Sequence, residues 1–547
     1  MAEPTVTAGH ELHLSVAPAW SAVAFDTVVE MAVAGCQTAP DQPAIILDDG
    51  IVVSRGTLLD QARRLATRVE AIIAPGDRVA MMIENRAECM IAFIGVIMGG
   101  GVLVSMNPAL RSHDAAHILR DCGCVLLLTG PELMATVEST RAACPALREV
   151  ILLDGPEPFG WDATAGLDPG SAPRRSPARR KDIATVYYTS GTTGAPKGCM
   201  LDHEWWLRLC DIHLRLTGAG QDHRPLCCLP FYNADAMQLL LCALHRGGTL
   251  VAMRRFSASR FWQVVAEHRV SELFLLASMP ILLLKQPPHP EERRHRLKTA
   301  VCALVPADLH RELNDRFGVA FLDSYGSTEA GWVTRVPSHM AAALVGSGTM
   351  GAALPEIELR VVDPNGRDVP DGVEGELLIR GPGLFSGYLD NEPATAEAMR
   401  GGWFHSGDVV RQDGAGLYYF VGRSKDIIRR SGVNISASEV EAVLRTHPLV
   451  IDAAVVAFPD PIRQEEVKAH LWIRPEAVAA DMAGDILAFC RNRLAAHKAP
   501  RFLAFHSSDF PRTPTLRVRK QDLNGVDPEL GTWDFEAGNW SEPPART

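Results

Sequence analysis

Short apolar runs rich in β-branched residues alternate with helical patterns through the first four hundred residues of the chain. The runs fall at 44–47, 78–83, 125–129, 149–153, 185–189 and 249–253, and helical patterns fall between them at 57–72, 203–216 and 258–268. Strand patterns that alternate with helical patterns are typical of proteins in which helices cover a mostly parallel sheet. We therefore predict an α/β fold with layered, largely parallel sheets.

The most apolar stretch, "MIAFIGVIMGGGVLVSM" at 90–106, imitates a membrane span. It is shorter than the roughly twenty residues that a spanning helix needs. Three consecutive glycines also interrupt it, at Gly99, Gly100 and Gly101. Because such a series of glycines ends a helix and permits a turn, we predict a buried helix, a glycine turn and a buried strand, and no membrane span.

A change of pattern near residue 420 predicts a domain boundary. The stretch 375–391 reads as β structure with turns, whereas 434–450 reads as a helix with a serine start, followed by a strand at 452–459 and a helix at 482–496. We predict a large N-terminal domain over 1–422 and a small, mobile α+β C-terminal domain over 423–547. The acidic end of the chain, with Trp533, Phe535 and Trp540, is expected to form a loose tail or to pack on the surface. Residues 155–182, rich in Pro, Gly, Arg and Asp, are expected to form a surface excursion.

Composition narrows the function classes. A chain of 547 residues, 47% of them hydrophobic, is long enough for more than one core. The formal net charge of -11 argues against a general nucleic-acid or anionic-membrane binder, although a local basic site for an anionic substrate stays compatible with it. The twelve cysteines show no metal-binding spacing, so we expect reduced, mostly buried thiols. The first twenty residues lack the features of a signal peptide, and we expect a cytoplasmic protein.

The stretch "YYTSGTTGAPKGCM" at 187–200 carries the first chemical signal. It follows a predicted strand at 183–188 and combines three glycines, several hydroxyl side chains and one lysine, Lys197. Glycines let backbone N–H groups converge on an anion, and hydroxyls and a lysine add donors and charge. The spacing does not fit the common nucleotide-binding P-loop. On these residues alone, a phosphate-binding loop and an ordinary Gly/Ser/Thr surface turn both stay open.

Further motifs follow in order along the chain. They are "YGSTEAG" (325–331), "GELLIRGP" (375–382), "WFHSGDVV" (403–410), "GRSKDIIRRSGVNIS" (422–436) and "FPRTPTLRVRK" (510–520). Together with the loop they resemble the acyl-adenylate-forming (ANL) superfamily, which includes acyl-CoA synthetases, peptide-synthetase adenylation domains and luciferases. The stretch 229–286 is most similar to the carnitine/crotonobetaine CoA ligase-like branch. The resemblance implies an AMP-forming ligase that uses ATP and Mg²⁺, with CoA as the acceptor and a small carboxylic acid as the substrate.

The resemblance also implies roles for individual residues. Thr189, Ser190, Thr192, Thr193, Gly194 and Lys197 would bind the β- and γ-phosphates of ATP; Tyr325 would stack on adenine, Thr328 would contact the α-phosphate and Glu329 would bind Mg²⁺; Asp408 and Arg423 would bind the ribose. Lys425 would be the hinge about which the small domain turns, with Arg429 and Gly432 on the face used for thioester formation. Taken singly, Glu329 could instead be a solvated residue and Asp408 could only cap a turn.

Three departures from the family pattern change what we expect. In "PRTPTLRVRK", Leu516 takes the place of a glycine and Arg517 that of the catalytic lysine, while Lys520 matches a second lysine. Arginine keeps the charge but has a bulkier, forked shape. Asn233 takes the place of an aromatic residue or histidine that gates the acyl pocket or the pantetheine tunnel. The adenine segment reads "ALVPADL" at 303–309 and keeps only its proline.

These departures leave several functions open. The chain could be an acid–CoA ligase, a carrier-protein-loading enzyme, a diazotase that activates nitrite for an aryl amine, or a catalytically silent nucleotide-binding relative. Pocket positions are expected around Asn233, Asp235 and Trp332, where a polar or an aromatic substrate would bind, although each of these residues could equally be structural. The sequence identifies neither the acid nor the oligomeric state.

Overall fold

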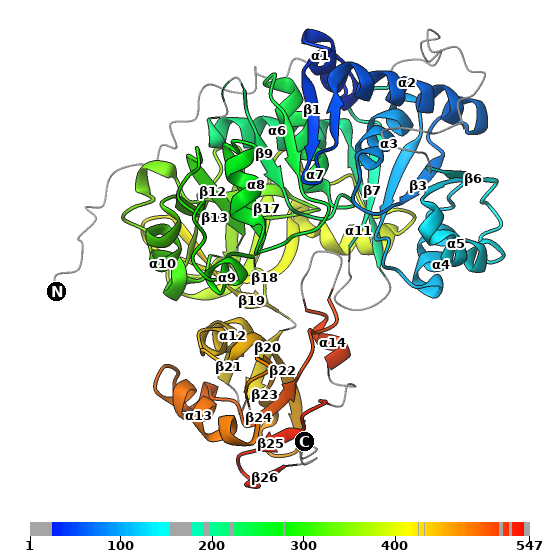
Figure 1. The fold of residues 1–547 in the computed structure, drawn as a ribbon. Coiled ribbons are helices and arrows are strands. Elements are labelled where there is room, and N and C mark those ends of the chain that lie inside the picture. The colour runs from blue at the N-terminus through cyan, green and yellow to red at the C-terminus, as the bar shows by residue number, and fades with distance from the viewer. Residues whose placement is uncertain are drawn as a thin grey trace. The chain divides into compact units, whose positions relative to one another are not determined.

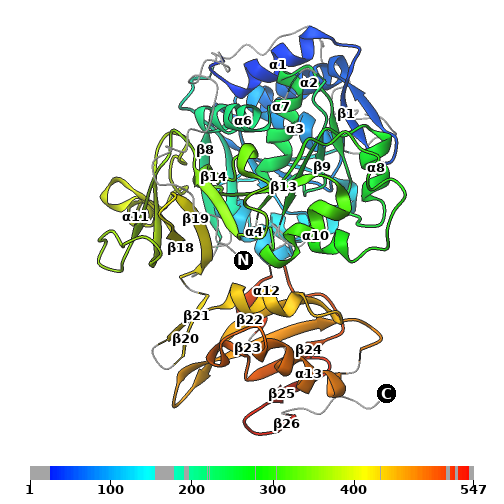
Figure 2. The ribbon, with the colours of Figure 1, turned by 90° about the vertical axis from the view of Figure 1, so that its left-hand side faces the viewer.

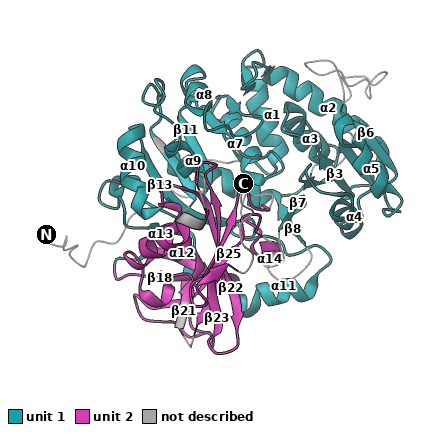
Figure 3. Ribbon diagram, turned by 60° about the horizontal axis from the view of Figure 1, so that its bottom comes forward, with its two compact units in different colours: residues 1–359, 379–405, 415–417 teal, residues 360–378, 406–414, 418–547 magenta. Residues whose placement is uncertain are grey.

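The computed structural model describes residues 25–153, 178–189, 196–218, 220, 222–276, 279–303, 305–424, 426–430, 433–477, 479–512, 518–523 and 528–540. The predicted surface excursion at 155–182 lies mostly outside these residues. The chain forms two compact units (Figure 3). One comprises residues 1–359, 379–405 and 415–417, and the other comprises 360–378, 406–414 and 418–547. The boundary after residue 422 stays a prediction.

The first unit is built on two sheets that are largely parallel, as predicted (Figure 1). One sheet has the order β6-β5-β3-β4-β7-β8, with β6 (Glu149–Leu152), β5 (Leu126–Thr129), β3 (Arg78–Met82), β4 (Val102–Met106), β7 (Ile183–Thr189) and β8 (Lys197–Asp202). The other runs β15-β14-β13-β12-β11-β9-β10-β1-β2, with β15 (Thr349–Ala353), β14 (Gly331–Arg335), β13 (Ala320–Ser327), β12 (Thr299–Ala303), β11 (Glu272–Leu276), β9 (Pro225–Cys227), β10 (Leu250–Ala252), β1 (Pro43–Leu47) and β2 (Val52–Ser54).

Helices pack between and around these sheets (Figures 1 and 2). The middle layer holds α3 (Ala87–Met98), α6 (His203–Thr217) and α7 (Ala234–His245), since α3 contacts β3 and β4, α6 contacts both β8 and β14, and α7 contacts β1, β9 and β10. The remaining helices of the unit are α1 (Val28–Thr38), α2 (Arg55–Ile72), α4 (Ser112–Asp121), α5 (Met134–Arg141), α8 (Phe261–Glu267), α9 (Met279–Leu284), α10 (Ala307–Phe317) and α11 (Glu392–Ala398).

The apolar stretch at 90–106 folds as predicted, into the buried helix α3, a glycine turn and the buried strand β4. Two glycines let α3 pack closely on α2. A Cβ atom on Gly95 would lie 2.9 Å from the Ala62 carbonyl oxygen, and one on Gly99 would lie 2.7 Å from that of Ala66. Among the described residues, no helix is both long enough and apolar enough to cross a bilayer. All twelve cysteines are buried and free, which agrees with the expectation of reduced thiols.

The second unit contains an α+β fold with its own core. Its sheet has the order β21-β20-β23-β24-β25-β26, with β22 paired to β23. Helices α12 (Ala437–Arg445) and α13 (Ala479–Arg491) contribute apolar side chains to the core, and Ser436 caps α12 as the serine start predicts. The strands are β20 (Ile427–Arg430), β21 (Val433–Ser436), β22 (Val450–Asp460), β23 (Gln464–Ile473), β24 (Phe502–His506), β25 (Thr532–Asp534) and β26 (Asn539–Trp540), and the short helix α14 is Lys520–Leu523. Strands β16 (Glu358–Val362), β17 (Glu374–Arg380), β18 (Phe404–Gln412) and β19 (Leu417–Arg423) are neighbours in that order.

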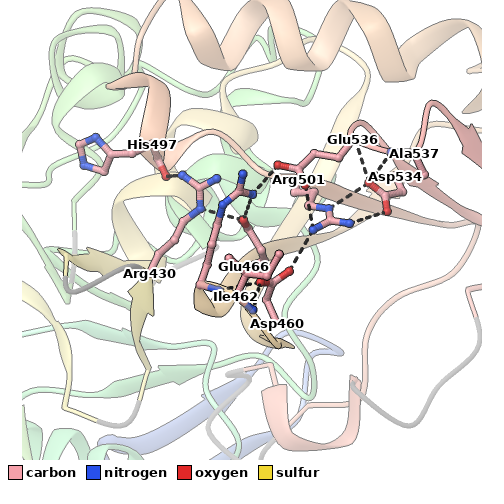
Figure 4. Close-up of polar contacts among 10 residues, drawn as sticks. Arg430, Asp460, Ile462, Glu466, His497, Arg501, Asp534, Glu536 and Ala537 are labelled. Carbon is pink, nitrogen blue, oxygen red and sulfur yellow. Dashed lines mark hydrogen bonds and ion pairs between the residues drawn. The ribbon is translucent and has the colours of Figure 1, made fainter.

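Of the two alternatives for the acidic end, a loose tail is wrong for residues 528–540, which add β25 and β26 to the sheet, and packing on the surface of the unit is what the structure has. Trp533, Phe535 and Trp540 pack against the core. Asp534 of this segment binds Arg501 with two contacts of 3.0 Å, and Arg501 also contacts Asp460 at the end of β22 at 3.0 Å (Figure 4). The negative charge that suggested a solvated tail thus serves to attach it.

Candidate active site

The ends of the predicted phosphate loop are paired in a hairpin. Thr189 ends β7 and Lys197 begins β8, and the two residues are directly opposite each other in the antiparallel ladder. The intervening Ser190, Thr192, Thr193 and Gly194 lie outside the described residues. Lys197 is half-buried.

The "YGSTE" motif spans the end of one strand and the turn to the next. Tyr325 lies in β13, and Thr328 and Glu329 lie in the turn between β13 and the antiparallel strand β14. The turn is tight, because a Cβ atom on Gly326 would lie 2.3 Å from the Gly331 carbonyl oxygen. Gly331 has a φ of 60°, which a glycine adopts without strain. The backbone therefore fixes where the Glu329 carboxylate emerges.

A residue that the sequence analysis missed joins these two motifs. The ring of Tyr388 lies 5.1 Å from the ammonium nitrogen of Lys197, and its hydroxyl donates a hydrogen bond of 3.2 Å to Glu329 Oε1. Backbone bonds hold Tyr388 there: Leu389 N–H donates to the Gly198 carbonyl at 2.7 Å, and Phe385 N–H donates to the Glu329 carbonyl at 2.7 Å. The predicted phosphate-binding lysine and the predicted metal-binding carboxylate thus share one neighbour.

The two residues predicted to bind ribose form an ion pair. Asp408 in β18 is opposite Arg423 in β19, and the Arg423 Nε atom lies 3.1 Å from Asp408 Oδ1. The Asp408 side chain is buried, so the Arg423 guanidinium compensates part of the cost of removing its charge from water. The hinge residue Lys425, with Gly432, Leu516 and Arg517, lies outside the described residues. Arg429 lies in β20, where its N–H donates to Glu465.

The three predicted pocket residues come from two elements of the first unit. Asn233 and Asp235 lie at the start of α7, and Trp332 lies in β14, where its ring is 5.4 Å from that of Phe274 and 6.0 Å from that of His213. Burial raises the pKa of Asp235 to about 6, against the opposing effects of its own backbone N–H and of His213. His213 is therefore near both Asp235 and Trp332, which places a titratable carboxyl and an aromatic ring around the same histidine.

The comparisons with known proteins agree with this fold and motif order, which define an adenylate-forming enzyme. A model of the AMP-binding enzyme family matches residues 33–389, and a model of the AMP-binding enzyme C-terminal domain matches residues 439–516. The chain belongs to the AMP-binding enzyme family. It is an AMP-forming ligase of the acid–CoA ligase type, and its resemblance to the acyl-adenylate-forming superfamily is confirmed.

Individual relatives span nearly the whole chain. A feruloyl-CoA synthase of an Amycolatopsis species is 32% identical over 480 residues, covering 87% of this chain and 94% of the relative. A crotonobetaine/carnitine–CoA ligase of Escherichia coli is 28% identical, covering 82% of this chain and 89% of the relative. The crystal structure of ATP-bound MatB from Rhodopseudomonas palustris superimposes with a TM-score of 0.80 at 25% identity, covering 92% of this chain and 99% of that one.

Proposed function

We propose that the protein adenylates a small carboxylic acid with ATP, releases pyrophosphate and then transfers the acyl group to CoA. The observation that supports the proposal most directly is that Lys197 and Glu329 both contact Tyr388, Lys197 through the ring and Glu329 through the hydroxyl. Two anions, ATP and a carboxylate, must approach each other for this reaction. A cation beside a carboxylate that can hold a metal ion supplies the positive charge that such an approach requires.

The chemistry proceeds in two steps. A carboxylate oxygen of the acid attacks the α-phosphorus of ATP, the bond to the bridging oxygen of pyrophosphate breaks, and an acyl-AMP anhydride forms. The CoA sulfur then attacks the acyl carbon, the thiol proton is lost to solvent or to a base, and AMP leaves. The first step converts a poor leaving group on the acid into a good one, which is why the enzyme consumes ATP.

We assign the residues as their family motifs imply. The residues proposed for the β- and γ-phosphates are Thr189, Ser190, Thr192, Thr193, Gly194 and Lys197; those for the nucleoside and α-phosphate are Tyr325, Thr328, Asp408 and Arg423. Glu329 suits Mg²⁺, because a carboxylate is the ligand that this hard cation prefers. Bound Mg²⁺ would neutralise phosphate charge. Arg517 would stabilise the charge that moves during adenylation, and Lys425 would be the hinge between the two steps.

Aromatic carboxylic acids are the first substrates to test. The Trp332 ring packs on Phe274 and on His213, which also interacts with Asp235, and a relative of this chain is a feruloyl-CoA synthase. Asp235, whose pKa is raised to about 6 by burial, would accept a hydrogen bond from a hydroxyl or amino substituent of the ring. The named relatives are CoA ligases, which favours CoA as acceptor over a carrier protein or over nitrite with an aryl amine.

The test is a panel of acids scored separately for the two steps. The full chain is incubated with ATP, Mg²⁺ and each acid, with and without CoA; pyrophosphate is measured continuously and acyl-CoA by mass spectrometry. We expect pyrophosphate release with at least one aromatic acid and a matching thioester only when CoA is present. Pyrophosphate release without any thioester would overturn CoA as the acceptor. No pyrophosphate with any acid of the panel, from a folded protein that binds ATP, would overturn adenylation.

A further inference from the structure

Three buried side chains with metal-binding atoms lie close together next to Trp332. His213 comes from α6, His223 from the segment before β9, and Glu272 from the first position of β11. One ligand atom of each side chain lies within 4.8 Å of the other two. The side chains are 1%, 3% and 4% exposed, respectively. None of them belongs to a motif assigned above, and the sequence spacing gives no sign of a metal site.

Backbone pairing fixes two of the three residues. Strands β9 and β11 are parallel neighbours, with Pro225 opposite Glu272. The Ser271 N–H donates to the Arg224 carbonyl at 2.9 Å, and the Ser271 hydroxyl accepts from the Arg224 N–H at 2.9 Å. These bonds join the residue after His223 to the residue before Glu272. The two ligand residues are therefore held side by side by the sheet itself.

The polar atoms of the cluster are close together but poorly satisfied. His213 Nε2 lies 2.8 Å from Glu272 Oε1, and His223 Nε2 lies 3.5 Å from Glu272 Oε2. Within the described part of the chain, none of these four atoms has a hydrogen-bond partner of acceptable geometry. Buried polar atoms are rarely left unsatisfied in native proteins, and a bound ion or water molecule is one partner that would satisfy them.

A buried cation lies close to the cluster. Arg335 in β14, itself buried, interacts electrostatically with Glu272, so its charge opposes a metal ion at this point.

We propose that His213, His223 and Glu272 bind one divalent transition-metal ion of the Zn²⁺ type. Two imidazole nitrogens and a carboxylate are a ligand set that Zn²⁺ accepts, at about 2.0–2.2 Å from each ligand atom. Ligand atoms around such an ion are roughly 3.3 Å apart, which small side-chain movements would reach from the observed positions. The ion would link α6, the segment before β9, and β11 next to Trp332. It would thereby stabilise one wall of the pocket proposed for the acid. This site is separate from the Mg²⁺ site proposed at Glu329.

Metal analysis of the intact protein tests the proposal. The full chain, purified without a histidine tag, is equilibrated with Zn²⁺, passed through a desalting column and analysed by inductively coupled plasma mass spectrometry. We expect about one Zn²⁺ per chain in the wild type and at least a tenfold loss of affinity in His223→Gln and Glu272→Gln. His113→Gln removes an exposed histidine and should keep the full metal content, since this side chain is 92% exposed. Wild-type protein without Zn²⁺, or a His223→Gln variant with wild-type affinity, would overturn the site.

Three further measurements extend the test beyond the ligand variants. Wild-type protein loaded with Co²⁺ should show the visible absorption of a four- or five-coordinate site; a spectrum of hexaaqua Co²⁺ alone would count against the proposal. Zn²⁺ should raise the melting temperature of the wild type and of His113→Gln equally, and no rise in either would contradict it. Arg335→Gln, where it folds, should bind Zn²⁺ more tightly than the wild type, because the opposing charge is gone; weaker binding would contradict the placement of the ion.

Discussion

The Tyr388 hydroxyl donates a hydrogen bond of 3.2 Å to Oε1 of Glu329. The same ring lies 5.1 Å from the ammonium nitrogen of Lys197. A cation over an aromatic face and a hydrogen bond to a carboxylate both restrict the side chains that take part in them. Tyr388 therefore holds a proposed phosphate ligand and a proposed metal ligand in fixed positions before ATP arrives, which reduces the reorganisation needed when it binds.

Tyr388→Phe should separate the two contacts, because it removes the hydroxyl and keeps the ring. Losing a hydrogen bond to a charged group costs about 1.5–3 kcal/mol, so we expect roughly a tenfold to hundredfold fall in kcat/KM for ATP and a higher Mg²⁺ requirement. Tyr388→Leu, which also removes the ring, should fall further. Tyr419→Phe is the matched control, since its hydroxyl also donates to a carboxylate, that of Asp413 at 2.8 Å. An unchanged Mg²⁺ dependence in Tyr388→Phe would show that the bond has no positioning role.

Lys197→Ala and Glu329→Gln should each lower the rate of pyrophosphate formation by at least about a hundredfold, the usual loss when one charge-stabilising group is removed. The measurement is initial pyrophosphate release at saturating acid, with circular dichroism to show that each variant is folded. Lys298→Ala removes an exposed lysine and should retain the wild-type rate. Near-normal rates in a folded Lys197 or Glu329 variant would remove the role assigned to that residue.

The elements that sequence patterns predicted well are those with continuous apolar runs. The predicted strand at 78–83 is β3 and that at 149–153 is β6, while the predicted helix at 203–216 is α6, each with small shifts at the ends. In a parallel sheet both faces of a strand are buried, so the pattern is a run of apolar residues that the sequence shows directly. The ordered motifs around Lys197 and Glu329 were equally visible, because each depends on residues adjacent in the chain.

Features that depend on long-range pairing were not predictable. Tyr388 is brought to Lys197 by backbone bonds between 386–389 and β8, and no local pattern indicates that partnership. His223 and Glu272 become neighbours only through the register of β9 and β11. The sequence could not decide between a loose tail and surface packing for the acidic end for a similar reason, since its charge complements Arg501, which is distant in sequence. Composition shows which charges a segment carries, but only the fold shows which partners they have.

A buried histidine pair in the second unit predicts a dependence of stability on pH. His470 Nδ1 lies 3.0 Å from His506 Nε2, and burial, with smaller effects of Lys468 and His506, lowers the pKa of His470 to about 3. In the unfolded chain this histidine has a pKa of about 6.5. As the pH falls below that value, the unfolded state binds a proton and the folded state does not. Stability from this group is complete above pH about 6.5 and declines by roughly 1.4 kcal/mol for each pH unit below it, until the folded pKa is reached.

His470→Gln should therefore flatten the pH dependence of the free energy of unfolding between about pH 6.5 and 4.5, even if it lowers stability at pH 7.5. Urea unfolding of wild type and variant across this range is the measurement, followed by tryptophan fluorescence. His113→Gln is the control and should leave the wild-type slope unchanged, because this side chain is 92% exposed. Equal slopes for wild type and His470→Gln would contradict a neutral His470 in the folded protein.

Two residues of "PRTPTLRVRK", Arg517 and Lys520, are candidates for the cation that acts during adenylation. Lys520, the residue that matches a family lysine, is already engaged: its Nζ lies 2.8 Å from Glu441 Oε1 and 3.7 Å from Asp426 Oδ2. Glu441 is itself buried, so this pair helps to compensate a carboxylate inside the second unit. Because Lys520 is engaged in these ion pairs, we expect Arg517 to be the residue of this motif that supplies the catalytic charge.

Arg517→Ala should slow pyrophosphate formation strongly, by about a hundredfold, while the Kd for ATP changes much less. The reason is that the charge is used mainly as negative charge migrates in the transition state, so kcat carries the loss. Arg517→Lys should restore part of the rate, limited by the branched Leu516 beside it, because lysine keeps the charge but not the fork of donors. Arg519→Ala is the matched control: its side chain pairs with Asp522 at 3.0 Å, and we expect a near-normal rate. If Arg517→Ala forms pyrophosphate at the wild-type rate, the charge comes from elsewhere and the case for an ordinary acid–CoA ligase weakens in favour of an altered adenylation chemistry.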